Sequence, residues 1–327
     1  MTAADDAIDA VPRPAQEALL AWYEASGRSL AFRATRDPYA VLVSELMAQQ
    51  TQAARAAVAW TAWMARFPTV DALAASSPAD VVRAWAGLGY NRRALMLRRA
   101  AQAVVDDHGG RLPDTVDELV TLPGVGPYTA RAVAAIAFGI PVGAVDTNVR
   151  RVLGRVMAGD SAALAPRTLQ QIADASVPAD RAGDWTHALM DLGAGPCGSR
   201  TPRCEACPIS RWCRFAAATA MGLGAAAGAG ENGIVPVPPR KSVPCRKTAA
   251  RRSVPTAVPF ASTNRWLRGR IIARAREAED GAWVGYDEPI GSHSGRAVRE
   301  AAVGLADDGL LEIRETSAGI EGRLPTK

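Results

Sequence analysis

Four closely spaced cysteines place the tightest constraint on how this chain can fold. Their spacing is C-x6-C-x2-C-x5-C, and they are Cys197, Cys204, Cys207 and Cys213. Four thiolates within 17 residues can surround one metal centre, either a tetrahedral zinc ion or a cubic [4Fe–4S] cluster. Structural zinc more often uses two separated C-x2-C pairs, so one compact loop with unequal gaps fits a cluster better, although the spacing alone leaves both open. The fifth cysteine, Cys245, stands alone and is interpreted as a spare thiol.

The residues before the cysteines are predicted to form a succession of helices. Apolar residues recur at a 3.6-residue spacing in Ala-rich segments, which Pro, Gly and Asp separate. No segment there alternates polar and apolar residues as a half-buried strand would. We therefore expect an all-α domain over residues 1–215. The predicted helices cover residues 15–26, 38–66, 78–87, 92–108, 116–121, 128–138, 147–157 and 166–176.

The rest of the chain divides into a linker and a small module. Residues 216–262 are Ala/Gly-rich and then Pro-rich and basic, without apolar periodicity, which is typical of a linker. Residues 264–276 and 295–308 have the pattern of helices, and residues 310–314 that of a strand. We expect residues 263–327 to form a small winged-helix-like module, frayed from residue 315 onward.

Composition and charge narrow the class of protein. No apolar run approaches the roughly 20 residues that span a bilayer, and the start lacks the basic and apolar regions of a secretory signal, so we expect a cytoplasmic protein. The net charge is +5, yet 11 Lys/Arg and no Asp/Glu lie between Asn232 and Arg276, which leaves 27 basic and 33 acidic residues elsewhere. Such a basic stretch fits a DNA-contacting arm and a solvated linker equally well.

The segment L-P-G-V-G-P-Y lies between two predicted helices. Its Gly124, Val125 and Gly126 allow a tight turn whose N–H groups face a phosphate beside a helix N-terminus. This is the logic of a helix–hairpin–helix, which holds the DNA backbone without reading bases. A plain turn between helices is the weaker alternative.

Two carboxylates stand in notable positions. Asp146, in A-V-D-T-N-V, directly precedes a predicted helix, where it is an N-cap or a carboxylate held at the positive end of a helix for catalysis. Glu45, in S-E-L-M-A-Q-Q-T, taken alone is an ordinary solvated helix residue. Neither residue alone indicates an active site.

Taken together, the patterns carry more weight. E-L-M-A-Q-Q-T, G-L-G-Y, L-P-G-V-G-P-Y, V-D-T-N-V and the four cysteines follow in this order. Between residues 15 and 213 the chain thereby resembles the helix–hairpin–helix superfamily of DNA glycosylases, which includes endonuclease III, and most closely its adenine-specific members. The resemblance implies a six-helix module at about 33–143 and an iron–sulfur module from residues 1–32 and 144–215, with a [4Fe–4S] cluster as cofactor. It also implies a monomer that binds double-stranded DNA with a mispaired or oxidised base, at the nucleoid.

The resemblance assigns catalytic roles. Glu45 would act as a general acid on the flipped purine, and Asp146 would stabilise the oxocarbenium ion on the sugar. Tyr128 occupies the position at which strand-cutting relatives carry a lysine nucleophile. The resemblance therefore implies that the protein hydrolyses the N-glycosidic bond of adenine opposite 8-oxoguanine or guanine and has little lyase activity. The four thiolates leave no open metal position, so the cluster would be structural.

Further residues match DNA-contacting positions of the family. Gln50 and Tyr90 correspond to wedge residues that fill the space of the flipped base, and Thr51 and Leu88 are placed to touch its former partner.

The chain also departs from the family pattern. In the base pocket, Phe32 precedes Arg33 where the family usually has tryptophan, and His187 stands where Gln or Glu is usual. The residues after the linker are too few for the Nudix-like domain of many adenine glycosylases.

Two alternatives stay open. One is a mismatch glycosylase for thymine or another base, which Tyr128 permits and His187 favours. The other is a non-catalytic iron–sulfur DNA-binding protein, which would not need Glu45. The presence of both Glu45 and Asp146 in their motifs argues against it.

Overall fold

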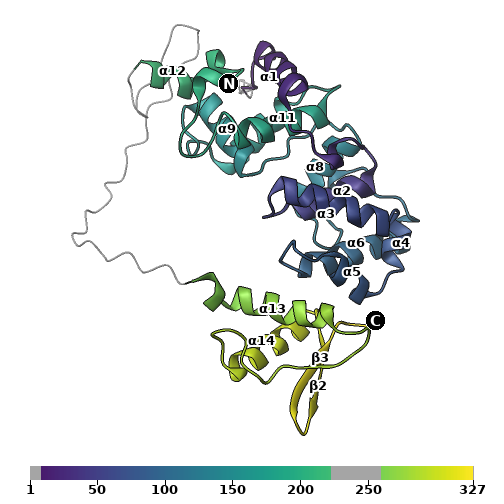
Figure 1. The fold of residues 1–327 in the computed structure, drawn as a ribbon. Helices are drawn as coiled ribbons and strands as arrows, with labels where there is room; N and C mark the ends of the chain where they lie inside the picture. Colours follow the sequence, from purple (N-terminus) through teal and green to yellow (C-terminus); the bar gives the residue numbers. More distant parts are fainter. Residues whose placement is uncertain (1–8, 222–258, 327) are drawn as a thin grey trace, which may run out of the picture.

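The computed structural model describes residues 9–221 and 259–326 (Figure 1). Most of the expected linker, residues 222–258, lies outside the described residues, as does Cys245. Residues 9–221 form helices without any strand. They are α1 Arg13–Ser26, α2 Pro38–Ala48, α3 Ala53–Arg66, α4 Val70–Ala74, α5 Pro78–Ala84, α6 Arg92–His108, α7 Val116–Leu119, α8 Pro127–Ala137, α9 Thr147–Ala158, α10 Pro166–Ala175, α11 Ala182–Ala194 and α12 Arg214–Ala220.

The helices surround two hydrophobic cores. One core contains the apolar faces of α2, α3, α6 and α8, with Trp63 and Trp85 fully buried. The other joins α1, α9, α10 and α11 with the cysteine-bearing loop, and includes Trp185 and Cys213. Since α8 and α11 pack against each other, the two cores are neighbours, and the N-terminus of α9 faces the first one.

Two expectations about element boundaries were wrong. Residues 38–66 are two helices, because Gln50 takes a left-handed backbone conformation (φ 53°) that no α-helix accommodates. The start of the expected linker, residues 216–220, belongs to α12. Helix α11, which the periodicity did not single out, carries functional candidates described below.

Residues 259–326 form a compact module. It consists of α13 Asn264–Glu277, β1 Val284–Gly285, α14 Gly295–Asp307, β2 Glu312–Thr316 and β3 Gly319–Arg323. The strands make an antiparallel sheet in the order β1-β3-β2. The expectation of a frayed end was wrong, since β3 pairs with both other strands and buries Ile320, and Leu324 is buried just beyond it.

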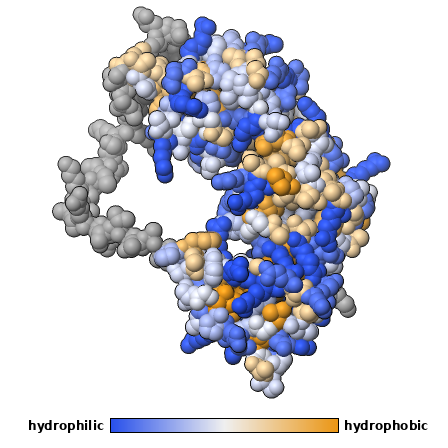
Figure 2. Space-filling model, in the orientation of Figure 1, coloured by the Kyte–Doolittle hydropathy of each residue, from blue (hydrophilic) through white to orange (hydrophobic). Residues whose placement is uncertain are grey.

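The module packs against α5 and α6. Ala79, Val82 and Leu95 from these helices share a core with the apolar residues of α13 and α14. The backbone N–H of Ala79 also donates to the carbonyl of Pro325 at 3.0 Å. Figure 1 shows that the described residues form an open arc. The face visible in Figure 2 carries mainly hydrophilic residues, with smaller apolar patches. Among the described helices none is long and apolar enough to cross a membrane.

Candidate active site and DNA interface

Glu45 lies on α2 and is only 8% exposed. The helix is fixed at its start, where Pro38 takes the first position and the Asp37 carboxylate accepts from the N–H of Ala40 at 2.8 Å. Every α2 residue from Tyr39 to Met47 is buried, so the helix carries Glu45 into the protein interior. Burial raises the pKa of Glu45 to about 7; the hydroxyl of Tyr128 opposes this shift as a hydrogen-bond donor, and the charge of Asp146 adds to it.

Asp146 caps the N-terminus of α9. One carboxylate oxygen accepts from the backbone N–H of Val149 at 2.7 Å, and the other accepts from the side-chain amide of Asn148 at 2.9 Å. The carboxylate is therefore held rigidly at the positive end of a helix, which stabilises negative charge. The sequence left open whether Asp146 is only a cap, and the structure places this cap within electrostatic reach of Glu45.

Tyr128 is the second residue of α8, directly after the glycine turn. Burial raises the pKa of its phenol well above 10, and the nearby charges of Glu45 and Asp146 raise it further. The phenol is therefore neutral near pH 7. Its hydroxyl donates to the sulfur of Met190 at 3.9 Å and lies close enough to Glu45 to affect the pKa of that carboxyl group. The three residues assigned to chemistry thus come from α2, α8 and the N-cap of α9, and lie close enough to affect one another's pKa.

The predicted base-pocket residues lie close to these acids. Arg33 is near enough to Glu45 for its charge to counter the rise in the Glu45 pKa. Its guanidinium makes two parallel hydrogen bonds, each 2.8 Å long, to the buried carboxylate of Asp191. The Arg33 Nε is buried and has no partner among the described residues. Phe32 packs edge-on against Trp60 in the first core.

His187 lies on α11, one turn before Asp191, and is 8% exposed. Burial, together with the charge of Arg33, lowers the pKa of its imidazole to about 3, so the ring is neutral at any physiological pH. Its nearest aromatic neighbour is Tyr23, with ring centroids 6.2 Å apart. Sequence reasoning missed Asp191, which the i,i+4 spacing from His187 would have indicated had α11 been recognised.

The predicted wedge residues have unusual backbones. Gln50 (φ 53°) and Tyr90 (φ 47°) are the non-glycine residues with positive φ in the described ranges. Such a conformation strains residues with a side chain and persists only where the surroundings impose it. The side chain of Tyr90 is 42% exposed, so its ring is accessible from solvent.

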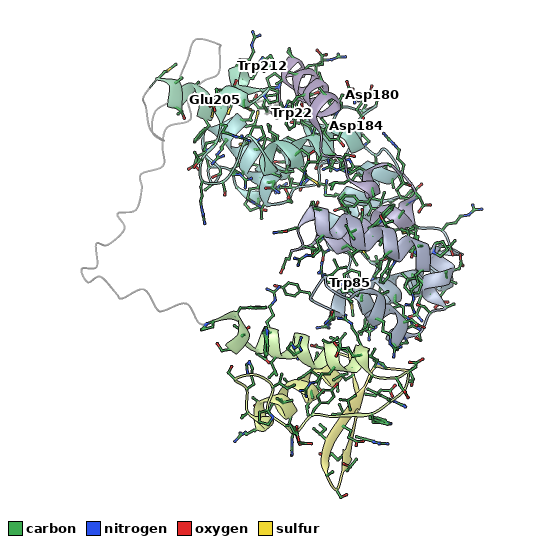
Figure 3. The ribbon with its side chains drawn as sticks, in the orientation of Figure 1. Trp22, Trp85, Asp180, Asp184, Glu205 and Trp212 are labelled. Atoms are coloured by element: carbon green, nitrogen blue, oxygen red, sulfur yellow. The ribbon has the colours of Figure 1, made fainter. Side chains whose placement is uncertain are left out.

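Arg93 holds the backbone of the two loops that carry Gln50 and Tyr90. One of its nitrogens, Nη1, donates to the carbonyl of Leu46 at 2.7 Å and to that of Gln49. The other, Nη2, donates to the carbonyls of Leu88 and Gly89 and to the Thr51 hydroxyl at 3.1–3.3 Å. Its guanidinium also lies over the ring of Trp85, which Figure 3 labels on the concave side of the molecule. Sequence reasoning missed Arg93, since nothing local distinguishes it from its neighbours.

The glycine turn precedes α8 as expected. Gly124 has φ 79°, and a Cβ there would meet the Cβ of Met96 at 2.7 Å, so only glycine fits. Val125 is buried and anchors the turn, and Gly126 is the N-cap residue of α8. Helix α8 begins at Pro127, directly after this turn, and the N-terminus of a helix suits a phosphate.

The four cysteines line one cavity between α9, α11 and α12. The guanidinium of Arg155, which is buried on α9, donates to the sulfur of Cys197 at 3.3 Å and to the carbonyl of Gly198 at 2.8 Å. Arg155 thus places a positive charge beside the sulfur of Cys197. In residues 9–221 and 259–326 no three His, Cys, Asp or Glu side chains are arranged to hold a single metal ion.

Comparisons with known proteins identify the family. The model of the "HhH-GPD superfamily base excision DNA repair protein" family matches residues 43–177. The chain is 42% identical to an "Adenine DNA glycosylase" of Mycobacterium tuberculosis (strain ATCC 25618 / H37Rv) over 265 residues, which cover 80% of this chain and 78% of the relative.

Solved structures show the same fold. A thermostable thymine-DNA glycosylase superposes with a TM-score of 0.58 and 30% identity, over 62% of this chain and 94% of the other. A trapped endonuclease III–DNA covalent intermediate superposes with a TM-score of 0.55 and 23% identity, over 64% and 96%. The chain belongs to the HhH-GPD superfamily of base excision DNA repair proteins.

Proposed function

We propose that the protein is a monofunctional adenine DNA glycosylase of base excision repair, which removes adenine mispaired with 8-oxoguanine or guanine. The observation that carries this proposal is the buried Glu45, whose pKa of about 7 leaves it substantially protonated at neutral pH beside Asp146 and Tyr128. A carboxylic acid that keeps its proton at neutral pH suits general acid catalysis. The identity to an adenine DNA glycosylase over 80% of the chain supports the choice of base.

The two acids divide the reaction between them. Glu45 protonates the extruded adenine, so that the bond between the base and the sugar carbon breaks and the base leaves neutral. The Asp146 carboxylate, held by Val149 and Asn148, stabilises the positive charge that develops on deoxyribose. A water then adds its hydroxyl to the sugar carbon and returns its proton to Glu45.

Tyr128 supports hydrolysis without strand cleavage. Its neutral phenol provides no amine for a Schiff base, so the DNA backbone stays intact and lyase activity is low.

In this proposal the protein binds DNA at two places, the glycine turn and the loops that carry Gln50 and Tyr90. The glycine turn, Gly124 to Gly126, binds a phosphate through N–H groups at the start of α8. Gln50 and Tyr90 fill the space that the extruded base leaves, and Thr51 contacts the opposite base. The side chain of Leu88 is buried in the first core, so Leu88 would support this contact from beneath the loop surface. The proposed partner is double-stranded DNA, bound by a monomer in the nucleoid of the cytoplasm.

We further propose that the cysteine loop holds a [4Fe–4S] cluster. The donors are four thiolates around a shared cavity, a chemistry and arrangement that fit a group larger than one ion. When bound, such a cluster would crosslink residues 197–213, and Arg155 would neutralise part of its thiolate charge.

For the C-terminal module we propose a winged-helix-like domain, separate from a glycosylase domain over residues 1–215. Its order of helix, strand, helix and two-stranded wing supports this assignment.

A thymine-removing mismatch glycosylase is the second candidate. It is favoured by the likeness to a thymine-DNA glycosylase and by His187, a neutral imidazole that offers one donor and one acceptor. In either case the pocket would include the unpartnered Nε of Arg33, with Phe32 beside it.

One experiment separates these functions. Purified protein is incubated with duplexes carrying A or T opposite guanine or 8-oxoguanine, and the released base is identified. Adenine release that Glu45→Gln abolishes supports the proposal, whereas thymine release assigns the second candidate. Binding to these duplexes without release of any base would refute both and indicate a non-catalytic protein.

A further inference from the structure

The C-terminal module is fixed directly beside the loop that carries Tyr90. Arg276, half-buried on α13, donates through Nε to the carbonyl of Val82 and through Nη2 to the side chain of Asn91, each at 2.9 Å. Asn91 follows Tyr90 in the chain. Arg83 and Asp280 add an ion pair of 2.9 Å across the same boundary. These contacts supplement a shared hydrophobic core, so the position of α13 relative to this loop is well defined.

From this position the module reaches Tyr90 itself. The guanidinium of Arg265, on the first turn of α13, lies 4.2 Å from the centroid of the Tyr90 ring. The guanidinium of Arg93 lies 5.6 Å from the same centroid. The aromatic ring proposed to enter the DNA is thus held by two cations, one from each part of the molecule. Attraction between a guanidinium and an aromatic ring favours this stacked arrangement.

We propose that the C-terminal module is part of the DNA-intercalating device, with Arg265 as a positioning residue that holds the Tyr90 ring ready for insertion into the duplex. The inference rests on the proposed function, because it assigns Tyr90 as a wedge. An exposed side chain must lose rotamer freedom when it enters DNA, and a ring that is already oriented loses less. Arg265 therefore speeds extrusion of the base without touching it.

The test measures extrusion separately from base removal. A duplex with 2-aminopurine opposite 8-oxoguanine is mixed with the full chain carrying Glu45→Gln, and the fluorescence rise that follows unstacking is timed. We expect Arg265→Ala to slow this rise roughly fivefold, and Arg265→Lys to restore part of the rate, since lysine also attracts an aromatic face. Arg296→Ala is the matched control, because it removes one exposed cation from α14 of the same module.

A double-mutant cycle separates positioning from direct contact with DNA. If Arg265 acts through Tyr90, adding Arg265→Ala to Tyr90→Ala changes the extrusion rate no further. An undiminished loss in the Tyr90→Ala background, or equal rates for Arg265→Ala and Arg296→Ala, would overturn the inference. Failure of the proposed function would look different: the unmodified chain would release no adenine, while the fluorescence would still report the effect of Arg265.

Discussion

At the scale of single residues, the burial of Glu45 suits its proposed catalytic role and has a cost in stability. Its pKa rises from 4.5 to about 7 on folding, so the folded chain binds this proton more tightly than the unfolded chain. Stability is therefore lost as the pH rises from about 4.5 through 7, and at alkaline pH the ionised group costs about 3 kcal/mol, at 1.36 kcal/mol per pKa unit.

Glu45→Gln is therefore expected to abolish base release and yet stabilise the fold. The gain in the free energy of unfolding should be about 3 kcal/mol at pH 8.5 and clearly smaller at pH 5.5, where the native acid is protonated. Urea denaturation at the two pH values measures this difference.

Single-turnover base release by the unmodified chain should fall about tenfold per pH unit above 7. A rate that keeps rising toward pH 9 would contradict the role of Glu45 as the acid.

Residue types and spacing predicted some of the site and missed the rest. Glu45, Asp146 and Tyr128 were found because each lies in a short pattern, and the structure brings them together. Asp191 and Arg93 were missed because their importance depends on groups distant in the chain. Asp191 accepts hydrogen bonds from Arg33, 158 positions away.

At the scale of elements, the break between α2 and α3 depends on Arg93. The segment has the apolar periodicity of one helix, and local propensity gave no sign of the left-handed Gln50. The turn persists because the Arg93 guanidinium binds the carbonyls that the turn exposes. Tertiary contact here overrides local preference.

Arg93→Ala is expected to leave these partly buried carbonyls without donors and to loosen the loops that carry Gln50 and Tyr90. We expect a loss of about 2 kcal/mol in the free energy of unfolding, within the range for buried groups left unsatisfied. Extrusion of 2-aminopurine should also slow, and Arg93→Lys should recover stability better than extrusion, because an ammonium cannot bridge both loops. Unchanged extrusion in a well-folded Arg93→Ala chain would show that the loops do not need this residue.

The glycine turn offers a prediction with an internal control. Gly124 and Gly139 both have positive φ (79° and 70°), but only Gly124 has a neighbour, Met96, where a Cβ would go. Gly139→Ala therefore measures backbone strain alone, about 1 kcal/mol. Gly124→Ala adds the clash with Met96, so it should lower the free energy of unfolding further. It should also weaken duplex binding, which fluorescence anisotropy measures. Equal costs and equal affinities for the two variants would argue against a close-packed turn.

At the scale of the whole molecule, the sequence predicted a helical body and a small following module, but not their contact. Periodicity describes how one element buries its apolar face, whereas Ala79 and Pro325 are in contact although most of the chain separates them. The burial of Leu324 was unpredictable for the same reason. Contact with the body fixes the module beside the Tyr90 loop, which no local pattern indicates.

Helix α9 links the cysteine loop to the proposed active site, which allows a test of the proposed cluster. Its N-terminus holds Asp146, and its Arg155 binds Cys197. Cys204→Ser should lower the iron content and the broad visible absorbance, and lower the melting temperature because the second core includes this loop. Base release should fall as the α9 terminus loosens. Cys245→Ser, the matched control, should keep iron, stability and rate unchanged. A chain with zinc in place of iron would refute the cluster, and a Cys204→Ser chain with full iron would refute this ligand.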